Sequence, residues 1–183
     1  MADGNPYVFG YGSLIWNPGF PFLHFERALL HGAHRSLSIY SHRHRGTPER
    51  PGLVFGLSHG GSCRGVAFEV ATERWSEVFD YLQAREQDRG VYREAWREVT
   101  LADGRRVRAL TYLVNEKHVQ FAGRLTIAEQ VALVRQGTGE SGRNTEYVRN
   151  TAKHLLSLGI RDRSLDLIVA ALDGDETLIV RSV

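Results

Sequence analysis

The chain has 183 residues, of which 42% are hydrophobic and 24% charged, and this size and composition suit one globular domain with an adequate core. Its 23 lysines and arginines nearly balance 21 aspartates and glutamates, so the formal net charge of +2 gives no electrostatic basis for binding nucleic acid or an anionic membrane. No apolar run approaches the roughly 20 residues needed to span a bilayer. A small molecule is therefore the favoured partner.

Cysteine content and the first residues predict a cytoplasmic protein. A single cysteine, Cys63, cannot form an internal disulfide. The opening segment MADGNPYVFG lacks the basic and apolar regions of a signal peptide. Because no repeat, low-complexity segment or long linker divides the chain, we predict one domain over residues 1–183. Nothing in the sequence indicates an oligomeric state.

The first half of the chain is rich in short apolar runs typical of strands. They span residues 7–9, 34–41, 53–57 and 64–70, and glycine and proline separate them. The pair Gly60-Gly61 lies between the last two runs and predicts a hairpin turn.

A second hairpin is predicted more clearly. Its strands are residues 98–101 and 107–114, and Asp103-Gly104 between them supplies the positive φ that a tight turn needs.

Between the two hairpins, a helix is predicted to begin near Thr72, which can cap it, and to stop near Gly90. The spacing i, i+3, i+4, i+7 gives this helix one buried face, formed by Trp75, Val78, Phe79 and Leu82.

The final third predicts three helices. They span residues 126–136, roughly 142–158 after Ser141, and 163–172 after Asp162. Because strands come first and helices last, the order favours an α+β domain rather than alternating βαβ units. We expect a mostly antiparallel sheet or small β-barrel with surrounding helices.

Glu86 is the most informative single residue. One more i+4 step from Leu82 reaches Glu86, so this carboxylate is predicted on the apolar face of its helix. Burial and the negative end of the helix dipole would both raise its pKa, which suits a general acid or base near neutrality. Alternatively, the helix ends early and Glu86 pairs with an arginine such as Arg85, Arg89 or Arg93.

A glycine-rich segment follows the first predicted strand. Residues Val8-Phe9-Gly10-Tyr11-Gly12-Ser13 run into Leu14-Ile15-Trp16, and the two glycines favour close backbone approach and an anion-binding arrangement of N–H groups. Ile15 stands where a dinucleotide-binding motif needs its third glycine. Ser13 lacks the second glycine of an esterase nucleophile motif. A purely structural turn is the alternative.

Two other clusters are weaker candidates for chemistry. The segment from His31 to Arg50 is rich in histidine and arginine, but His42 and His44 have no third ligand at a recognisable metal-binding spacing. We therefore predict a solvated loop rather than a metal or nucleic-acid site. Cys63 lies near His59, yet single cysteines in cytosolic chains are usually inert. We expect no metal and no cofactor.

Taken together, several segments resemble the ChaC family of glutathione-specific γ-glutamyl cyclotransferases, and the resemblance spans nearly the whole chain. The segments that carry it are Val8-Phe9-Gly10-Tyr11-Gly12-Ser13-Leu14-Ile15-Trp16, His44-Arg45-Gly46-Thr47-Pro48 with Pro51-Gly52, Arg64-Gly65-Val66-Ala67-Phe68, Tyr81-Leu82-Gln83-Ala84-Arg85-Glu86, Ala109-Leu110-Thr111-Tyr112 and Ser141-Gly142-Arg143-Asn144-Thr145-Glu146-Tyr147. Six segments in the family's order make a specific signal.

The resemblance implies a γ-glutamyl cyclotransferase-like fold and a lyase that releases 5-oxoproline and Cys-Gly from glutathione. It implies that the loop Val8 to Ser13 binds the γ-glutamyl group and that Glu86 is the proton acceptor. Cysteine stands before Arg64, where many relatives carry tryptophan, and residues 87–89 differ from some relatives. Neither departure removes a catalytic group.

Tyr112 is a further candidate for binding a substrate oxygen, with Tyr11 and Tyr147 as weaker ones. The alternative for each tyrosine is a core residue with a satisfied hydroxyl group. Arginines of the His31–Arg50 segment would line the substrate entrance and meet the glycine carboxylate of glutathione.

The implied reaction needs no enzyme nucleophile, because the α-amine of the γ-glutamyl group attacks its own γ-carbonyl. Two other functions stay open: a cyclotransferase for other γ-glutamyl amino acids or amines, and a non-catalytic regulator associated with cation transport.

Overall fold

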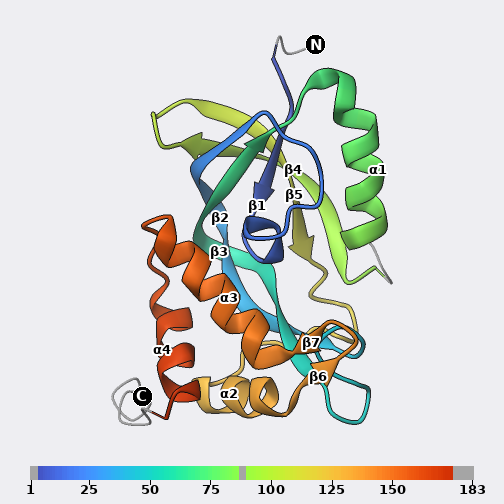
Figure 1. Ribbon diagram of the computed structural model, residues 1–183, viewed down its shortest axis with the longest axis vertical. Helices are drawn as coiled ribbons and strands as arrows, with labels where there is room; N and C mark the ends of the chain where they lie inside the picture. The colour runs from blue at the N-terminus through green and yellow to red at the C-terminus, as the bar shows by residue number, and fades with distance from the viewer. Residues whose placement is uncertain (1–3, 87–89, 175–183) are drawn as a thin grey trace. The chain divides into compact units, whose positions relative to one another are not determined.

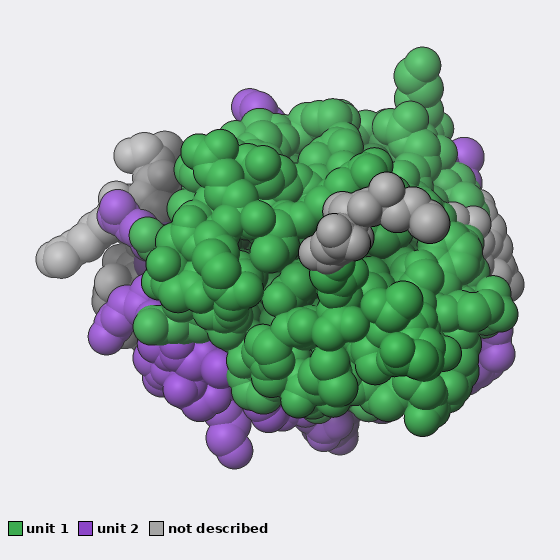
Figure 2. All heavy atoms as spheres, turned by 90° about the horizontal axis from the view of Figure 1, so that it is seen from above, with its two compact units in different colours: residues 1–36, 56–118 green, residues 37–55, 119–183 purple. Residues whose placement is uncertain are grey.

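The computed structural model describes residues 4–86 and 90–174 (Figure 1). They fall into two compact units, coloured separately in Figure 2. The first unit comprises residues 1–36 and 56–118, and the second comprises residues 37–55 and 119–183. Each unit is therefore assembled from two separated stretches of chain. The single domain expected over residues 1–183 stays a prediction.

Five strands form a closed barrel. They are β1 (Tyr7–Gly10), β2 (His24–Ser41), β3 (Gly52–Glu69), β4 (Tyr92–Leu101) and β5 (Arg106–Val114), in the order β1-β3-β2-β4-β5. In the first unit β1 pairs antiparallel with β3 and parallel with β5, and β4 pairs antiparallel with β2 and β5. The predicted α+β class with a small barrel is confirmed.

The hairpin of β4 and β5 turns where the sequence predicted it. Gly104 has a φ of 90°, and the Leu101 N–H donates to the Arg105 carbonyl at 2.8 Å. The strand before the turn is longer than predicted, because β4 begins at Tyr92 rather than at Glu98.

The hairpin predicted at Gly60-Gly61 is wrong. Residues Gly52–Glu69 form the single strand β3, within which Gly60 and Gly61 have φ values of 89° and 71°. His34 on β2 contacts the Gly60 carbonyl through Nδ1 at 2.9 Å. Two positive φ values inside a paired strand are typical of a β-bulge, which interrupts the regular pleat without reversing the chain.

Helix α1 (Trp75–Glu86) packs along β4 in the first unit. Val78 and Leu82 are fully buried, and the Trp75 ring lies against Trp96 of β4 with centroids 5.5 Å apart. The predicted cap is wrong: Thr72 opens a short 3-10 turn, η2 (Thr72–Arg74), ahead of α1.

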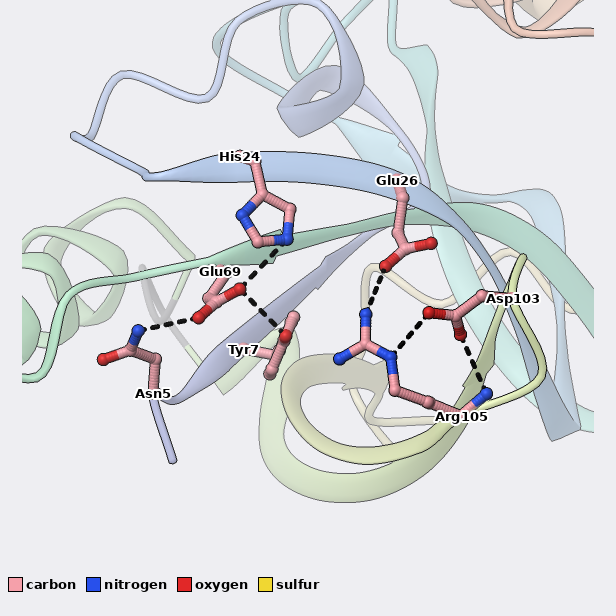
Figure 3. Close-up of polar contacts among 7 residues, drawn as sticks. All are labelled: Asn5, Tyr7, His24, Glu26, Glu69, Asp103 and Arg105. Carbon is pink, nitrogen blue, oxygen red and sulfur yellow. Dashed lines mark hydrogen bonds and ion pairs between the residues drawn. The ribbon is translucent and has the colours of Figure 1, made fainter. Parts of the chain in front are cut away.

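A polar network ties together one end of the barrel (Figure 3). Its members are Asn5, Tyr7, His24, Glu26, Glu69, Asp103 and Arg105. Glu69 is central, because its carboxylate accepts hydrogen bonds from Asn5 at 2.7 Å and Tyr7 at 3.0 Å and lies 3.0 Å from His24 Nε2. Burial disfavours the ionised form, but these partners outweigh burial and hold the pKa of Glu69 below its usual range. The network therefore fixes the starts of β1 and β2 on the end of β3.

The second unit is mainly helical. Helices α2 (Ile127–Gln136), α3 (Asn144–Ser157) and α4 (Arg163–Leu172) contact one another pairwise, and the short hairpin β6 (Thr138–Gly139) and β7 (Gly142–Arg143) joins α2 to α3. No helix within the described ranges has the length and hydrophobicity to cross a membrane.

The caps of these helices partly follow the sequence predictions. Thr126 and Glu129 form a capping box on α2, and the Asp162 carboxylate accepts from the Leu165 N–H on α4. Ser141 does not cap α3, because the capping position is Arg143.

Asn144, the first residue of α3, is fully buried and bonds to a strand. Its side-chain oxygen accepts from the Leu53 N–H at 2.7 Å, and its side-chain nitrogen donates to the Leu53 carbonyl at 2.7 Å. One side chain thus satisfies both backbone groups of a buried strand residue, as a neighbouring strand would.

Replacing Asn144 by alanine should lower the free energy of unfolding by about 2 to 4 kcal/mol, because it leaves the buried N–H and C=O of Leu53 without partners. Asn150→Ala is the matched control, since Asn150 is exposed on the same helix. Urea unfolding of both variants measures the difference. Equal stabilities would show that Asn144 has no such structural role.

Candidate active site

The glycine-rich segment forms a turn at the end of β1. The chain leaves β1 at Gly10 and enters the 3-10 turn η1 (Ser13–Ile15), in which the Ile15 N–H donates to the Gly12 carbonyl at 3.0 Å. By helix geometry, the first N–H groups of such a turn have no partner within it. The side chains of Val8 and Phe9 are fully buried, so only their main chain is available to a ligand.

Strands on several sides hold this segment in place. The Tyr11 carbonyl accepts from Arg35 Nε at 2.5 Å, and Arg35 Nη2 also donates to the Arg64 carbonyl of β3 at 2.6 Å. The Tyr11 hydroxyl donates to the Tyr112 carbonyl of β5 at 3.0 Å. A Cβ at Gly65 would collide with the Gly10 carbonyl, so glycine is required where β3 passes this close to β1.

Arg85 joins the same segment to the end of α1. Its Nη2 donates to Ser13 Oγ at 3.0 Å, and its Nη1 donates to the carbonyls of Asn17 and Pro18 at 2.8 and 3.0 Å. With 20% of its side chain exposed, Arg85 is largely enclosed by these partners. The last turn of α1, which ends with Glu86, is therefore fixed against the glycine-rich segment.

Glu86 lies on the buried side of α1, as its spacing from Leu82 predicted. Its side chain is 15% exposed, and Oε1 lies 3.4 Å from Arg85 Nε. Burial raises the pKa of the Glu86 carboxyl, and the positive charge of Arg85 opposes this rise without cancelling it. Glu86 therefore pairs with Arg85, as the alternative proposed, and also has a raised pKa. Arg89, another arginine considered for this pair, lies outside the described residues.

Tyr112 on β5 is buried, with 1% of its surface exposed. Within the described ranges, its hydroxyl is a buried side-chain oxygen with no hydrogen-bond partner in the protein. Burial and the negative charges of Glu86 and Glu94 raise the pKa of Tyr112, so the hydroxyl keeps its proton and acts as a donor. The alternative of a core tyrosine with a satisfied hydroxyl is wrong for Tyr112.

Glu94 is a member of the site that the sequence analysis missed. It lies directly opposite Tyr112 in the β4–β5 ladder, and its Oε2 accepts from Gln83 Nε2 at 2.5 Å. Gln83 precedes Glu86 by three residues and shares its side of α1. The sequence analysis began this strand at Glu98. A strand begun earlier, with its residues paired outward from the Asp103-Gly104 turn, would have placed Glu94 opposite Tyr112.

The histidine- and arginine-rich segment is not a single loop as predicted, because its residues 31–41 belong to β2. Three of its later residues make contacts within the second unit. Arg43 pairs with Glu140 at 2.8 Å, His44 contacts Ser141 at 3.0 Å, and Arg45 lies over the Tyr147 ring at 5.3 Å from its centroid. Its predicted role at a substrate entrance stays a prediction.

Two further candidate residues, Cys63 and Tyr147, make contacts with the backbone. Cys63 is buried, and its thiol lies 3.7 Å from the Arg64 carbonyl. The Tyr147 hydroxyl accepts from the Phe55 N–H at 3.1 Å. In residues 4–86 and 90–174, no group of three or more His, Cys, Asp or Glu side chains is placed to hold a metal ion.

Tyr112→Phe should leave the free energy of unfolding unchanged or raise it by up to about 1 kcal/mol, because the hydroxyl has no partner to lose within the part of the chain that the structure describes. Tyr11→Phe is the matched comparison and should lower it by about 1 kcal/mol, because the Tyr11 hydroxyl donates to a buried carbonyl. Urea unfolding measures both. A greater loss for Tyr112→Phe would mean that its hydroxyl supports the fold.

Glu86→Gln should raise the free energy of unfolding at pH 8, because a neutral amide avoids the cost of burying a charge. A carboxyl whose pKa is raised by folding stabilises the fold below its pKa in the unfolded chain. That contribution is lost as the pH rises through the raised pKa of the folded protein. The advantage of the variant should therefore shrink toward pH 4, as urea unfolding across this range would measure.

Glu77→Gln is the control for this experiment. Glu77 lies on the exposed side of the same helix, and its hydrogen bonds with Arg74 hold its pKa below the usual range. Its replacement should therefore slightly lower stability at pH 8. A Glu86→Gln protein less stable than the parent at pH 8 would contradict the burial argument.

Comparison with known proteins identifies the family. A family model described as ChaC-like protein matches residues 6–174. The glutathione-specific gamma-glutamylcyclotransferase of Escherichia coli strain K12 is 31% identical over 169 residues, which cover 92% of this chain and 73% of the relative. The glutathione-specific gamma-glutamylcyclotransferase 1 of Rattus norvegicus is 33% identical over 184 residues, and the match covers 93% of this chain and 81% of the rat protein.

A solved structure shows the same fold. The crystal structure of a gamma-glutamyl cyclotransferase specific to glutathione from yeast matches with a TM-score of 0.85 at 24% identity, covering 94% of this chain and 97% of the yeast chain. The match to the family model spans the glycine-rich segment, α1 with Glu86, and β5 with Tyr112. The chain therefore belongs to the ChaC-like protein family.

Proposed function

We propose that this protein is a glutathione-specific γ-glutamyl cyclotransferase, a carbon–nitrogen lyase that converts glutathione to 5-oxoproline and cysteinylglycine. The observation that carries the proposal is Glu86, a largely buried carboxyl with a raised pKa, whose charge acts on the buried Tyr112 hydroxyl, which has no hydrogen-bond partner among the described residues. The Escherichia coli and rat relatives bear this activity in their names.

The reaction is an intramolecular ring closure. The α-nitrogen of the γ-glutamyl group forms a bond to the γ-carbonyl carbon, and the amide bond from that carbon to the cysteine nitrogen breaks. Two protons leave the α-nitrogen as it changes from an ammonium group to a lactam N–H, and the departing nitrogen gains two as it becomes the ammonium group of cysteinylglycine, so no oxidant or other co-reactant is consumed. Holding the chain in the bent conformation can contribute up to about 7 to 11 kcal/mol.

Glu86 takes a proton from the α-ammonium group before attack and delivers a proton to the departing nitrogen. A carboxylate of ordinary pKa is a weak base toward an ammonium group, and a raised pKa improves the match. Arg85 keeps the carboxyl in place and limits the rise in pKa, so that Glu86 still ionises.

The segment of Val8, Phe9, Gly10, Tyr11, Gly12 and Ser13 binds the γ-glutamyl group, with main-chain N–H groups of Gly10 to Ser13 donating to its α-carboxylate. Two guanidinium groups support this role, because Arg35 donates to the Tyr11 carbonyl and Arg85 donates to Ser13 Oγ. The Tyr112 hydroxyl donates to a substrate oxygen, which supplies the partner that residues 4–86 and 90–174 do not provide.

A second candidate keeps the chemistry and changes the substrate. A relative from Arabidopsis thaliana, 28% identical over 165 residues, is named Gamma-glutamylcyclotransferase 2-3 without reference to glutathione. Rates of 5-oxoproline release from glutathione and from γ-glutamyl-alanine separate the two.

We place the reaction in the cytoplasm, where the single cysteine of this chain suits a reducing compartment.

Glu86→Gln should reduce kcat for 5-oxoproline release from glutathione by about 10²- to 10⁴-fold, because the amide cannot accept the proton. Glu77→Gln, the same change on the exposed side of α1, should retain the parent rate. In the parent, kcat/KM should rise with pH through the raised pKa of Glu86.

Wild-type-like turnover by Glu86→Gln would end the proposed role of this residue. Glutathione binding by the parent protein without any 5-oxoproline release would instead favour the non-catalytic regulator.

A further inference from the structure

Two carboxylates from different elements influence the Tyr112 hydroxyl. Glu86 comes from the last turn of α1, and Glu94 comes from β4, directly opposite Tyr112 in the ladder with β5. The charges of both act on the hydroxyl, which is buried and has no partner among the described residues. The Gln83 amide donates to Glu94 at 2.5 Å and links the two elements. These four residues are called the Glu86 cluster below.

The charge of this cluster favours a cationic ligand. Glu94 accepts a hydrogen bond from the neutral Gln83 amide, and its charge acts on the Tyr112 hydroxyl. Arg85, which pairs with Glu86, also donates to Ser13, Asn17 and Pro18, so its charge is shared with the glycine-rich segment. A half-buried carboxylate that accepts its hydrogen bond from a neutral amide is complementary to a compact cation that can donate several hydrogen bonds.

We propose that Glu94 binds the α-ammonium group of the substrate and thereby selects γ-linked compounds that carry a free α-ammonium. This inference rests on the proposed function. The α-ammonium group has three N–H donors, which suffice for Glu86, Glu94 and one further acceptor. Glu86 accepts the proton that is transferred, and Glu94 holds the nitrogen in position.

The proton balance indicates which kinetic constant Glu94 controls. A fixed negative charge beside the nitrogen stabilises its ammonium form and so opposes loss of the proton. The same charge also stabilises the protonated form of Glu86, which receives that proton a short distance away. Because the two effects largely cancel, Glu94 strengthens binding of the ammonium form with little effect on the transfer step.

The decisive experiment compares two ligands that differ only in the ammonium group. Glutathione is used as substrate, and its deaminated analogue glutaryl-cysteinylglycine is used as a competitive inhibitor of 5-oxoproline release. Glu94→Gln keeps an oxygen acceptor for Gln83 but removes the charge. It should raise KM for glutathione about tenfold or more, change kcat less than about threefold, and change Ki for the analogue less than about twofold.

Glu98→Gln is the matched control. Glu98 lies four residues further along β4, is exposed, and pairs with Arg106 at 3.1 Å. The substitution therefore removes the same charge from the same strand at a position away from Tyr112. It should leave KM, kcat and Ki at the parent values. Parallel changes in KM and Ki with Glu94→Gln, or no change in either, would overturn the proposal.

A structural role for Glu94 is tested with Gln83→Leu. This variant breaks the hydrogen bond between α1 and β4 but leaves the Glu94 charge. The ratio of KM for glutathione to Ki for the analogue should stay within about threefold of the parent. If Gln83→Leu reproduces the effect of Glu94→Gln on this ratio, Glu94 acts by docking α1 and the proposal is wrong.

Failure of the proposed function gives a different result. If the parent protein releases no 5-oxoproline, calorimetric titration with the two ligands replaces kinetics. A preference for glutathione over the analogue that Glu94→Gln removes would then support the ammonium site in a protein without turnover. Equal affinities of the parent for the two ligands would overturn it.

Discussion

The guanidinium group of Arg85 is the interaction on which the site depends. It donates to Ser13, Asn17 and Pro18 of the segment that follows β1, and its Nε lies 3.4 Å from the carboxylate of Glu86. A planar cation with several fixed donors can hold three acceptors and one counter-charge at once, which a lysine cannot do. The glycine-rich segment and the end of α1 therefore have a defined position relative to each other within the first unit.

This arrangement also sets the electrostatic balance at Glu86. Burial alone would favour a neutral carboxyl, and a dedicated arginine pair would favour a carboxylate. Arg85 also donates to two backbone carbonyls and to Ser13, and its effect on Glu86 is smaller than the effect of burial, so the pKa stays raised. The same guanidinium thus fixes the position of Glu86 without fully stabilising its charge, which is the condition that proton transfer near neutrality requires.

Periodicity and turn chemistry predicted the positions that depend on local sequence. The i+4 step from Leu82 placed Glu86 on the buried side of α1, and Asp103-Gly104 located the β4–β5 turn. Glycine pairs were ambiguous, because positive φ serves a bulge as well as a hairpin, and Gly60-Gly61 proved to lie within β3. Glu94 was missed for a similar reason: its importance arises from the strand opposite, and no local pattern in Tyr92–Leu101 extended the strand far enough to reveal that pairing.

Two features of the first unit run against stability, and they occur together. A buried carboxyl with a raised pKa and a buried hydroxyl without a partner among the described residues each carry a desolvation cost, whereas the polar network around Glu69 at one end of the barrel is well satisfied. Local violations of this kind concentrate at functional sites, because a ligand supplies what the free protein leaves unpaired. An ammonium group and a carbonyl oxygen are the partners that would relieve both costs at once, and a γ-glutamyl group carries both.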